Sequence, residues 1–187
     1  MKKTLLSIIF GLLLAPAAHA GVLIDFYAGA FGGMGENITY IPAGTTLPSA
    51  KDLRKSGKSF GAVAGINIPL VRIEGEYDYI SAKNLNLNAA MANVYVKLLP
   101  TPVVKPYIGI GAGMTFGGKI DTNVLDVKFE KSKALQGMLG LQVEIPLTSL
   151  AVDLEWRVLY APKVYEIVGK EIGFLQSDIR AKIRYVF

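Results

Sequence analysis

The chain ends in the sequence Ile179-Arg180-Ala181-Lys182-Ile183-Arg184-Tyr185-Val186-Phe187, in which apolar and charged side chains alternate. Because the side chains of a β-strand point alternately to its two faces, this segment predicts a strand with one apolar and one charged face. The amphipathic last strand of a soluble sandwich would show the same alternation, so the rest of the chain has to decide between the two. The apolar face comprises Ile179, Ala181, Ile183, Tyr185 and Phe187, and the charged face comprises Arg180, Lys182 and Arg184.

The first twenty residues have the three parts of a secretory signal peptide. Met1-Lys2-Lys3 is basic, residues 5–14 are mostly apolar, and Ala18-His19-Ala20 is a small-residue cleavage site. We therefore expect residues 1–20 to be removed and residues 21–187 to form one exported domain. The apolar run is too short to span a bilayer as a helix, and no later segment approaches the required length of about 20 apolar residues. Insertion into a membrane would therefore require strands.

The composition is strongly apolar although no long apolar segment follows the signal peptide. Hydrophobic residues make up 51% of the chain, the mean hydropathy is +0.38 and the formal net charge is +5. Removing Lys2 and Lys3 lowers the net charge from +5 to +3. A net charge this small does not indicate a nucleic-acid ligand. The chain contains no cysteine, so no disulfide stabilises it. Apolar residues spread out in alternation are typical of a β-barrel with an apolar outer surface.

Alternation of apolar and polar residues predicts eight strands. The connections between them alternate between longer loops and short turns that contain proline. Short turns at one rim and longer loops at the other are the plan of an outer-membrane barrel with its loops outside the cell. The predicted strands are Val22–Phe31, Ser59–Ile68, Val71–Ile80, Ala89–Leu99, Tyr107–Phe116, Leu135–Ile145, Leu150–Tyr160 and Leu175–Phe187.

Two features distinguish this barrel from a soluble barrel of the lipocalin type, which has the same period with its faces reversed. The strand glycines, such as Gly109, Gly111 and Gly113, fall on the polar face, where a narrow interior needs small residues. The apolar face carries about forty side chains, more than the interior of an eight-stranded barrel holds. The predicted fold class is therefore all-β, an eight-stranded antiparallel up-and-down transmembrane β-barrel.

The sequence resembles the small eight-stranded outer-membrane β-barrels, the superfamily that holds the OmpA transmembrane domain, OmpX, OmpW and the opacity-type adhesins. The resemblance is carried by the signal peptide, the segment Lys105–Gly113 and the ending Arg184-Tyr185-Val186-Phe187. It implies a monomer in a Gram-negative outer membrane, in contact with lipid and lipopolysaccharide. It also implies that the outer-membrane assembly machinery reads the apolar face of the last strand as an insertion signal. The chain departs from OmpA in ending at this strand, so we expect no periplasmic peptidoglycan-binding domain.

The residues available for chemistry argue against an enzyme. Several outer-membrane barrels are enzymes that use a histidine, but the single histidine of this chain, His19, lies in the signal peptide. The mature chain therefore has no Ser-His, Asp-His or Cys-His pair and no Cys or His metal ligand. A hydrolase that uses only carboxylates stays open. We expect no catalytic residue, no cofactor and no metal site.

The charged faces of the strands are the main candidate site. Their side chains point into the barrel by parity, and they must pair there because an isolated buried charge is costly. The favoured interpretation is a salt-bridged plug, and a narrow channel for ions or small solutes is the alternative. The expected pairs are Asp25 with Arg184 or Lys182, Glu74 and Glu76 with Lys97, and Glu144 with Arg157. The full set is Asp25, Arg72, Glu74, Glu76, Asp78, Lys97, Glu144, Asp153, Glu155, Arg157, Asp178, Arg180, Lys182 and Arg184.

The longest predicted loop, Gly32–Lys58, carries a basic cluster of Lys51, Arg54, Lys55 and Lys58. We interpret this cluster as a solvated surface attracted to the phosphates of lipopolysaccharide. The alternative is an adhesin that binds a host or neighbouring cell surface through residues 32–58. The sequence thus predicts a non-enzymatic outer-membrane protein with a structural or surface-interaction role.

Overall fold

The computed structural model describes residues 24–40, 54–82, 85–98, 103–119, 128–129, 131–167 and 170–187. Within these ranges the chain forms eight long strands and the two-residue strand β6. The predicted signal peptide and residues 21–23, the first of the predicted mature chain, lie outside the described residues. The strands are β1 (Asp25–Tyr40), β2 (Arg54–Asn67), β3 (Val71–Ala82), β4 (Leu85–Lys97), β5 (Val104–Lys119), β6 (Lys128–Phe129), β7 (Ser132–Glu144), β8 (Leu150–Ile167) and β9 (Lys170–Val186).

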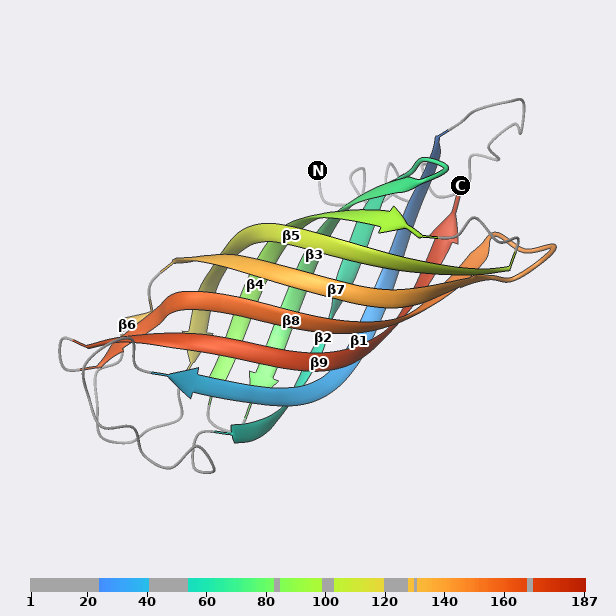
Figure 1. Ribbon diagram of the computed structural model, residues 1–187. Helices are drawn as coiled ribbons and strands as arrows, with labels where there is room; N and C mark the ends of the chain where they lie inside the picture. Colours follow the sequence, from blue (N-terminus) through green and yellow to red (C-terminus); the bar gives the residue numbers. More distant parts are fainter. Residues whose placement is uncertain are drawn as a thin grey trace, which may run out of the picture.

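The strands form a closed antiparallel barrel (Figure 1). Consecutive long strands pair with each other, and β1 closes the sheet by pairing with β9 from Tyr27 opposite Val186 to Tyr40 opposite Gly173. The short strand β6 pairs with the far part of β8, where Lys128 lies opposite Glu166. This topology confirms the predicted eight-stranded up-and-down barrel.

The connections of the barrel differ at its two rims. The β2–β3, β4–β5 and β7–β8 connections lie at one rim, together with the start of β1 and the C-terminus (Figure 1). We call this end the turn rim and the opposite end the loop rim. The backbone N–H of Phe187 donates to the carbonyl of Phe26 at 2.8 Å, which ties the C-terminus to β1 at the turn rim.

The pairing register gives the barrel a large stagger. Starting from Met114 of β5 and stepping once across every long strand leads back to β5 at Val104, ten residues nearer the turn rim. Such a stagger tilts the strands against the barrel axis, and in an eight-stranded barrel it leaves an interior just wide enough for side chains to fill. The space available to charged groups is therefore narrow.

The strands extend further toward the loop rim than the alternation predicted. β1 continues to Tyr40 instead of ending at Phe31, and β2 begins at Arg54 instead of Ser59. Alternation fades in these extensions because side chains beyond the hydrocarbon need no apolar face, whereas the backbone hydrogen bonds continue. The segment between the end of β1 and the start of β2 is therefore only residues 41–53, about half of the predicted loop.

Two glycines show why the inner face needs small residues. A Cβ atom at Gly109 would lie 2.4 Å from Cδ1 of Tyr95, and one at Gly140 would lie 2.5 Å from Cζ of Tyr107. The two tyrosines are buried in the lumen and pack edge to face, with ring centroids 5.3 Å apart. The glycines therefore leave the space that the tyrosine rings fill.

Candidate functional site

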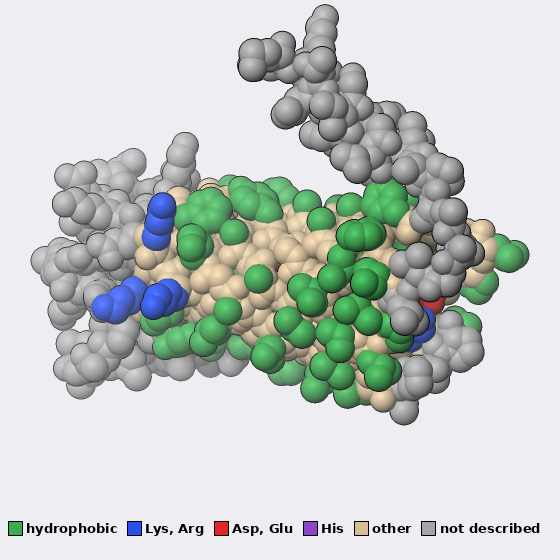
Figure 2. Space-filling view, turned by 90° about the horizontal axis from the view of Figure 1, so that it is seen from above, with side chains coloured by type: hydrophobic (Ala, Val, Ile, Leu, Met, Phe, Trp, Pro, Cys, Tyr) green, Lys and Arg blue, Asp and Glu red, His purple; other side chains and the backbone are tan. Residues whose placement is uncertain are grey.

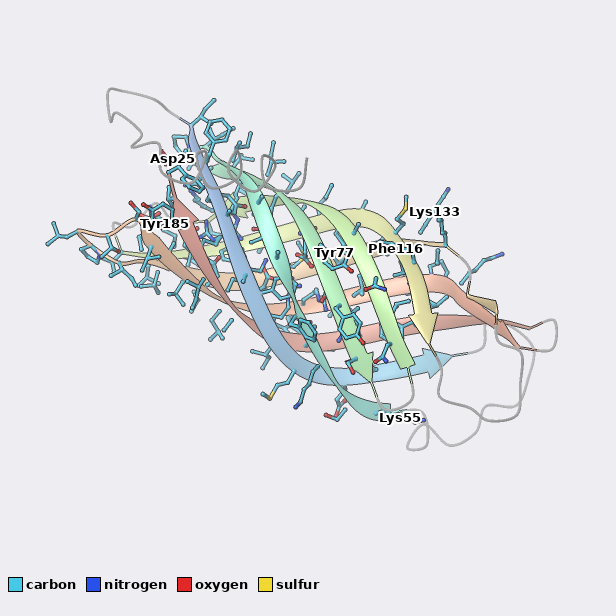
Figure 3. The ribbon with its side chains drawn as sticks, turned by 180° about the vertical axis from the view of Figure 1, so that it is seen from behind. Asp25, Lys55, Tyr77, Phe116, Lys133 and Tyr185 are labelled. Carbon is cyan, nitrogen blue, oxygen red and sulfur yellow. The ribbon has the colours of Figure 1, made fainter. Side chains whose placement is uncertain are left out.

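The outer surface of the barrel is apolar over most of its height (Figures 2 and 3). Ile110, Phe26 and Ile183 are 73%, 61% and 60% exposed, whereas the side chains of Arg72 and Arg180 are almost completely buried. Exposed apolar and buried charged side chains are the reverse of the pattern in soluble proteins. This surface is stable where hydrocarbon surrounds it, so the barrel is of the transmembrane type and the lipocalin alternative is excluded.

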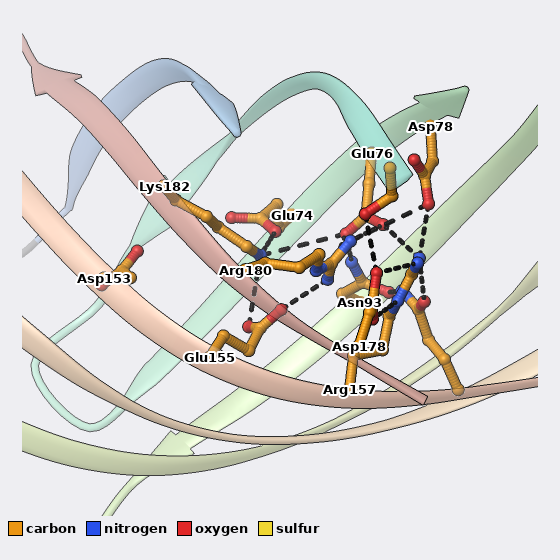
Figure 4. Close-up of polar contacts among 12 residues, drawn as sticks. Glu74, Glu76, Asp78, Asn93, Asp153, Glu155, Arg157, Asp178, Arg180 and Lys182 are labelled. Atoms are coloured by element: carbon orange, nitrogen blue, oxygen red, sulfur yellow. Dashed lines mark hydrogen bonds and ion pairs between the residues drawn. The ribbon is translucent and has the colours of Figure 1, made fainter. Parts of the chain in front are cut away.

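A network of ion pairs fills the middle of the lumen (Figure 4). The guanidinium of Arg180 on β9 binds Glu76 of β3, with 2.7 Å between Nη1 and Oε1, and also donates to Glu155 of β8. Two residues further along β9, the Nζ of Lys182 lies 3.0 Å from Oε1 of Glu74 and 3.2 Å from Oε2 of Glu155. Cations of one strand thus join carboxylates from two walls of the barrel.

Arg157 of β8 organises the part of the network nearer the loop rim. Its Nη1 lies 2.5 Å from Oδ2 of Asp78, and its Nη2 lies 2.8 Å from both Oδ2 of Asp178 and Oε1 of Gln176. The hydroxyl of Ser59 donates to the same Asp178 carboxylate at 2.7 Å. All of these side chains are buried, so each charge is compensated by neighbours and not by bulk water.

Arg184 and Arg72 form the part of the network nearer the turn rim. Arg184 binds Asp153 through two parallel hydrogen bonds of 2.6 and 2.9 Å, and Arg72 reaches the same carboxylate at 3.3 Å. The guanidinium of Arg72 also lies 4.0 Å from the ring centroid of Tyr95 and 4.6 Å from that of Tyr107. These cation–π contacts add to the ion pairs because aromatic faces are electronegative.

The end of the lumen at the loop rim is filled by apolar side chains, which the sequence-based expectation of a charged lumen did not include. We call this cluster the apolar plug; its members are at most 4% exposed. The signal was present in the sequence, because Leu159 and Ala161 share the lumen parity of Arg157 and so break the polar inner face of β8. The plug consists of Ile80, Leu87, Ala89, Met91, Ala134, Leu159, Ala161, Val164 and Phe174.

The buried charges of the described lumen balance. Six acids and six cations are at most 6% exposed, so the layer below the apolar plug carries no net formal charge. The acids are Glu74, Glu76, Asp78, Asp153, Glu155 and Asp178, and the cations are Arg72, Lys97, Arg157, Arg180, Lys182 and Arg184. Twelve of the fourteen charged residues of the expected set therefore lie together inside the barrel, and Asp25 and Glu144 lie at the turn rim.

The ion pairs differ from the expected ones because long side chains cross the narrow lumen and do not stay with the neighbouring strand. Glu74 binds Lys182 of β9, whereas Lys97 donates to Oδ1 of Asn67 at 2.6 Å. Glu144 binds Lys105 at 2.6 Å, far from Arg157. These expected pairs were wrong, because adjacency on the sheet does not determine which charges meet across a narrow lumen.

The position of Asp25 also differs from the expected one. The β1–β9 register places Gly29 opposite Arg184, so Asp25 lies four residues nearer the turn rim than the strand position that faces this cation. Arg184 binds Asp153 of β8 instead. Asp25 lines a cavity of about 460 Å³ at the turn rim, together with Asn67, Glu144 and Phe187.

Solved structures identify the fold. Neisserial surface protein A (NspA) has 18% sequence identity and a TM-score of 0.64, and the match covers 87% of this chain and 97% of that chain. The chain has the fold of the small outer-membrane β-barrels. Ail of Yersinia pestis, solved with the heparin analogue sucrose octasulfate, has 12% identity, coverage of 86% and 99%, and a TM-score of 0.42. The N-terminal β-barrel domain of Pseudomonas aeruginosa OprF has 12% identity, coverage of 84% and 99%, and a TM-score of 0.46. No protein-family model and no curated protein matches the sequence.

The outer-membrane-type barrel carries polar aromatic contacts on its outer face. The indole Nε1 of Trp156 donates to Oγ of Ser177 at 3.0 Å, and the hydroxyl of Tyr77 donates to Oδ1 of Asn88 at 2.9 Å. Tyr77 of β3 and Phe116 of β5, labelled in Figure 3, lie on either side of β4 with their ring centroids 6.3 Å apart. The two hydrogen bonds satisfy the polar ends of the Trp156 and Tyr77 rings on an otherwise apolar surface.

The other predicted site residues of this barrel lie on its surface. Ile179, Ile183 and Tyr185 of the closing strand face outward and are 58%, 60% and 47% exposed, and Ala181 shares this face. In the basic cluster, Lys55 and Lys58 are exposed on β2 and Arg54 begins that strand, whereas Lys51 lies outside the described residues. Three of the four basic residues therefore belong to the paired strand β2.

The described residues offer no metal site of His, Cys, Asp and Glu side chains, since no group of three or more of them is arranged to hold an ion. In the same part of the chain, no helix is long and apolar enough to cross a membrane.

Proposed function

We propose that the protein is a non-enzymatic integral protein of a Gram-negative outer membrane, with its loop rim outside the cell. The barrel acts as a rigid membrane element, and the loop rim presents a surface for interaction. The observation that carries the proposal is the filled lumen, in which a charge-balanced network is covered by the apolar plug. A lumen filled in this way favours a structural and surface role over transport.

The state of the buried carboxylates supports a non-enzymatic role. Glu76 and Glu155 each bind cations of β9, and both are almost completely buried. A carboxylate hydrolase needs two carboxyl groups that reach substrate and water from one cleft. At the turn rim, where a cavity exists, Glu144 is engaged by Lys105 at 2.6 Å. The geometry therefore favours structural carboxylates.

The proposed partners follow from the outer surface. Lipid and lipopolysaccharide contact the apolar belt, and the outer-membrane assembly machinery reads the outward face of β9 that ends at Phe187. A monomer is proposed because closure of β1 on β9 leaves no free edge in the sheet for a second copy to pair with. Two measurements test the location. The protein should fractionate with outer membranes and should show a heat-modifiable mobility on gels, and a tag in residues 41–53 should be accessible on intact cells.

The filled lumen gives a direct test against the channel alternative. Folded protein in planar bilayers should show no unitary conductance above that of protein-free membranes. Discrete conductance steps that change in size with Glu76→Gln would contradict the proposal and favour a channel, because Glu76 lies at the centre of the network.

The adhesin alternative depends on residues 41–53, and it stays a proposal. The strands β1 and β2, which this segment joins, extend beyond their predicted ends toward the loop rim. Deleting residues 41–53 should abolish adhesion to host cells if the alternative holds, whereas deleting residues 120–127 between β5 and β6 serves as the control. Both deletions leave the long strands intact, so the barrel should still fold.

A further inference from the structure

Lysines on the outer face of the barrel gather at the loop rim. Figure 2 shows Lys and Arg side chains at the loop end of the face that it draws. Lys58 of β2 and Lys133 of β7 are both exposed there, and Figure 3 shows Lys133 projecting away from the barrel. At the turn rim, by contrast, Lys105 is paired with Glu144 at 2.6 Å, and the outward-facing side chains that the structure describes there carry no charge. The two boundaries of the apolar belt therefore differ in charge.

Three of these lysines lie side by side where β7 begins and β8 passes it. Lys131 and Lys133 flank Ser132, and the backbone N–H of Lys163 on β8 donates to the hydroxyl of Ser132 at 3.2 Å. All three lysine side chains are exposed. We call Lys131, Lys133 and Lys163 the lysine patch. The hydrogen bond from Lys163 to Ser132 brings the three cations together on two paired strands.

An apolar surface begins directly below the lysine patch. On β7, Leu135 and Leu139 are 59% and 50% exposed, and they lie opposite Tyr160 and Trp156 of β8. These side chains are bulky and continuous across the two strands, so they offer acyl chains a long contact. The acid Glu36, which also faces outward near the loop rim, lies on β1, two strands away from β8.

We propose that the lysine patch binds the phosphate groups of an anionic glycolipid in the outer leaflet, whose acyl chains pack along β7 and β8. This inference rests on the proposed outer-membrane location and orientation. Ammonium groups at the edge of an apolar belt meet headgroup phosphates while their carbon stems stay on apolar surface. The occupant is a phosphorylated lipid because the cations and the apolar surface adjoin on the same two strands.

Trp156 gives the experiment a local probe, because it is the one tryptophan of the chain and lies on β8 below the lysine patch. The full chain is folded into nanodiscs of neutral phosphatidylcholine with increasing fractions of a glycolipid that carries brominated acyl chains. Bromine quenches tryptophan fluorescence on contact, so quenching reports a glycolipid seated beside Trp156. The glycolipid is used in a bis-phosphorylated and a dephosphorylated form.

The phosphorylated glycolipid should quench Trp156 at a much lower mole fraction than the dephosphorylated form. The double variant Lys131→Gln/Lys133→Gln should raise the half-quenching fraction by about 30-fold, since each lysine near an anionic headgroup strengthens binding about fivefold and the two factors multiply. The matched variant Lys55→Gln/Lys58→Gln removes the same charge from β2 and should change it by less than about twofold. Lys131→Arg/Lys133→Arg should restore binding.

Equal quenching by the two glycolipids, or an equal loss in both double Gln variants, would overturn the proposal, because the attraction would then be diffuse. Heat-modifiable mobility of the same samples separates this failure from a failure of the proposed function. If the barrel folds but shows no preference for the phosphorylated glycolipid, only the proposal about the lysine patch is wrong. If the chain forms no barrel in the nanodisc, the proposed outer-membrane function is wrong.

Discussion

Arg180 of β9 and Glu76 of β3 meet across the lumen, with 2.7 Å between Nη1 and Oε1, although 104 residues separate them in the chain. The two strands are not neighbours in the sheet, because β1 and β2 lie between them. The ion pair therefore joins walls of the barrel that no backbone hydrogen bond connects, and it braces the closed sheet from inside.

Glu76→Gln should destabilise the barrel by about 3–5 kcal/mol, because Arg180 and Lys182 then stay buried with too little counter-charge. Urea unfolding in lipid vesicles, followed by the fluorescence of Trp156, measures the free energy of unfolding. Asp25→Asn likewise replaces a carboxylate by an amide, at the turn rim outside the buried network, and should have a small effect. Equal effects of the two substitutions would show that the network does not brace the barrel.

Phe174→Ala should cost about 3–5 kcal/mol, because it opens a cavity in the apolar plug, where Phe174 is completely buried. Phe60→Ala is the matched control, since Phe60 is 55% exposed on the outer face and leaves no enclosed cavity. The same vesicle unfolding assay compares the two variants. If the plug also closes the lumen, Phe174→Ala should be the more permeable variant in a liposome leakage assay.

Gly109→Ala should cost about 1–3 kcal/mol through overpacking, because the new Cβ meets the buried ring of Tyr95. Gly137→Ala is its control on the outer face of β7, where a Cβ meets no atom within 4 Å. The expected order of stability, with Gly137→Ala near the parent protein and Gly109→Ala well below it, is measured by urea midpoints. The reverse order would contradict the assignment of the inner face.

Leu147→Gly should stabilise the protein. Leu147 lies in the β7–β8 turn with a φ of 64°, a left-handed conformation that favours glycine. The N–H of Thr148 closes this turn on the carbonyl of Ile145 at 3.2 Å. The unfolding equilibrium constant should fall by about fivefold. Leu70→Gly in the β2–β3 turn lacks this conformational gain and should not stabilise, so stabilisation by both substitutions would exclude backbone strain as the cause.

The strands and their faces were predictable because a β-strand has a fixed period of two. Ile183 and Arg184 are adjacent in the chain, and the alternation placed them on opposite faces. The glycines of the polar face and the number of apolar side chains then assigned Ile183 to the outside. The loop-rim ends were less predictable. Beyond the hydrocarbon, strand residues need not alternate between apolar and polar. The residue pattern therefore did not predict that β1 continues to Tyr40.

The partners inside the lumen were not predictable from adjacency. Glu74 was expected to bind Lys97 on the neighbouring strand, yet it binds Lys182 of β9 because a narrow lumen brings opposite walls within reach of long side chains. The apolar plug was missed for a related reason. Ile80 of β3 and Phe174 of β9 are far apart in sequence and join one cluster only after the barrel has closed.

By itself, the sequence determined which residues face hydrocarbon and which face the lumen, since alternation is a local property of each strand. Only the tertiary structure decided which charges meet and where the lumen is sealed. Those contacts depend on the stagger and closure of the sheet, through which residues such as Glu76 and Arg180 meet across a space that no local pattern describes.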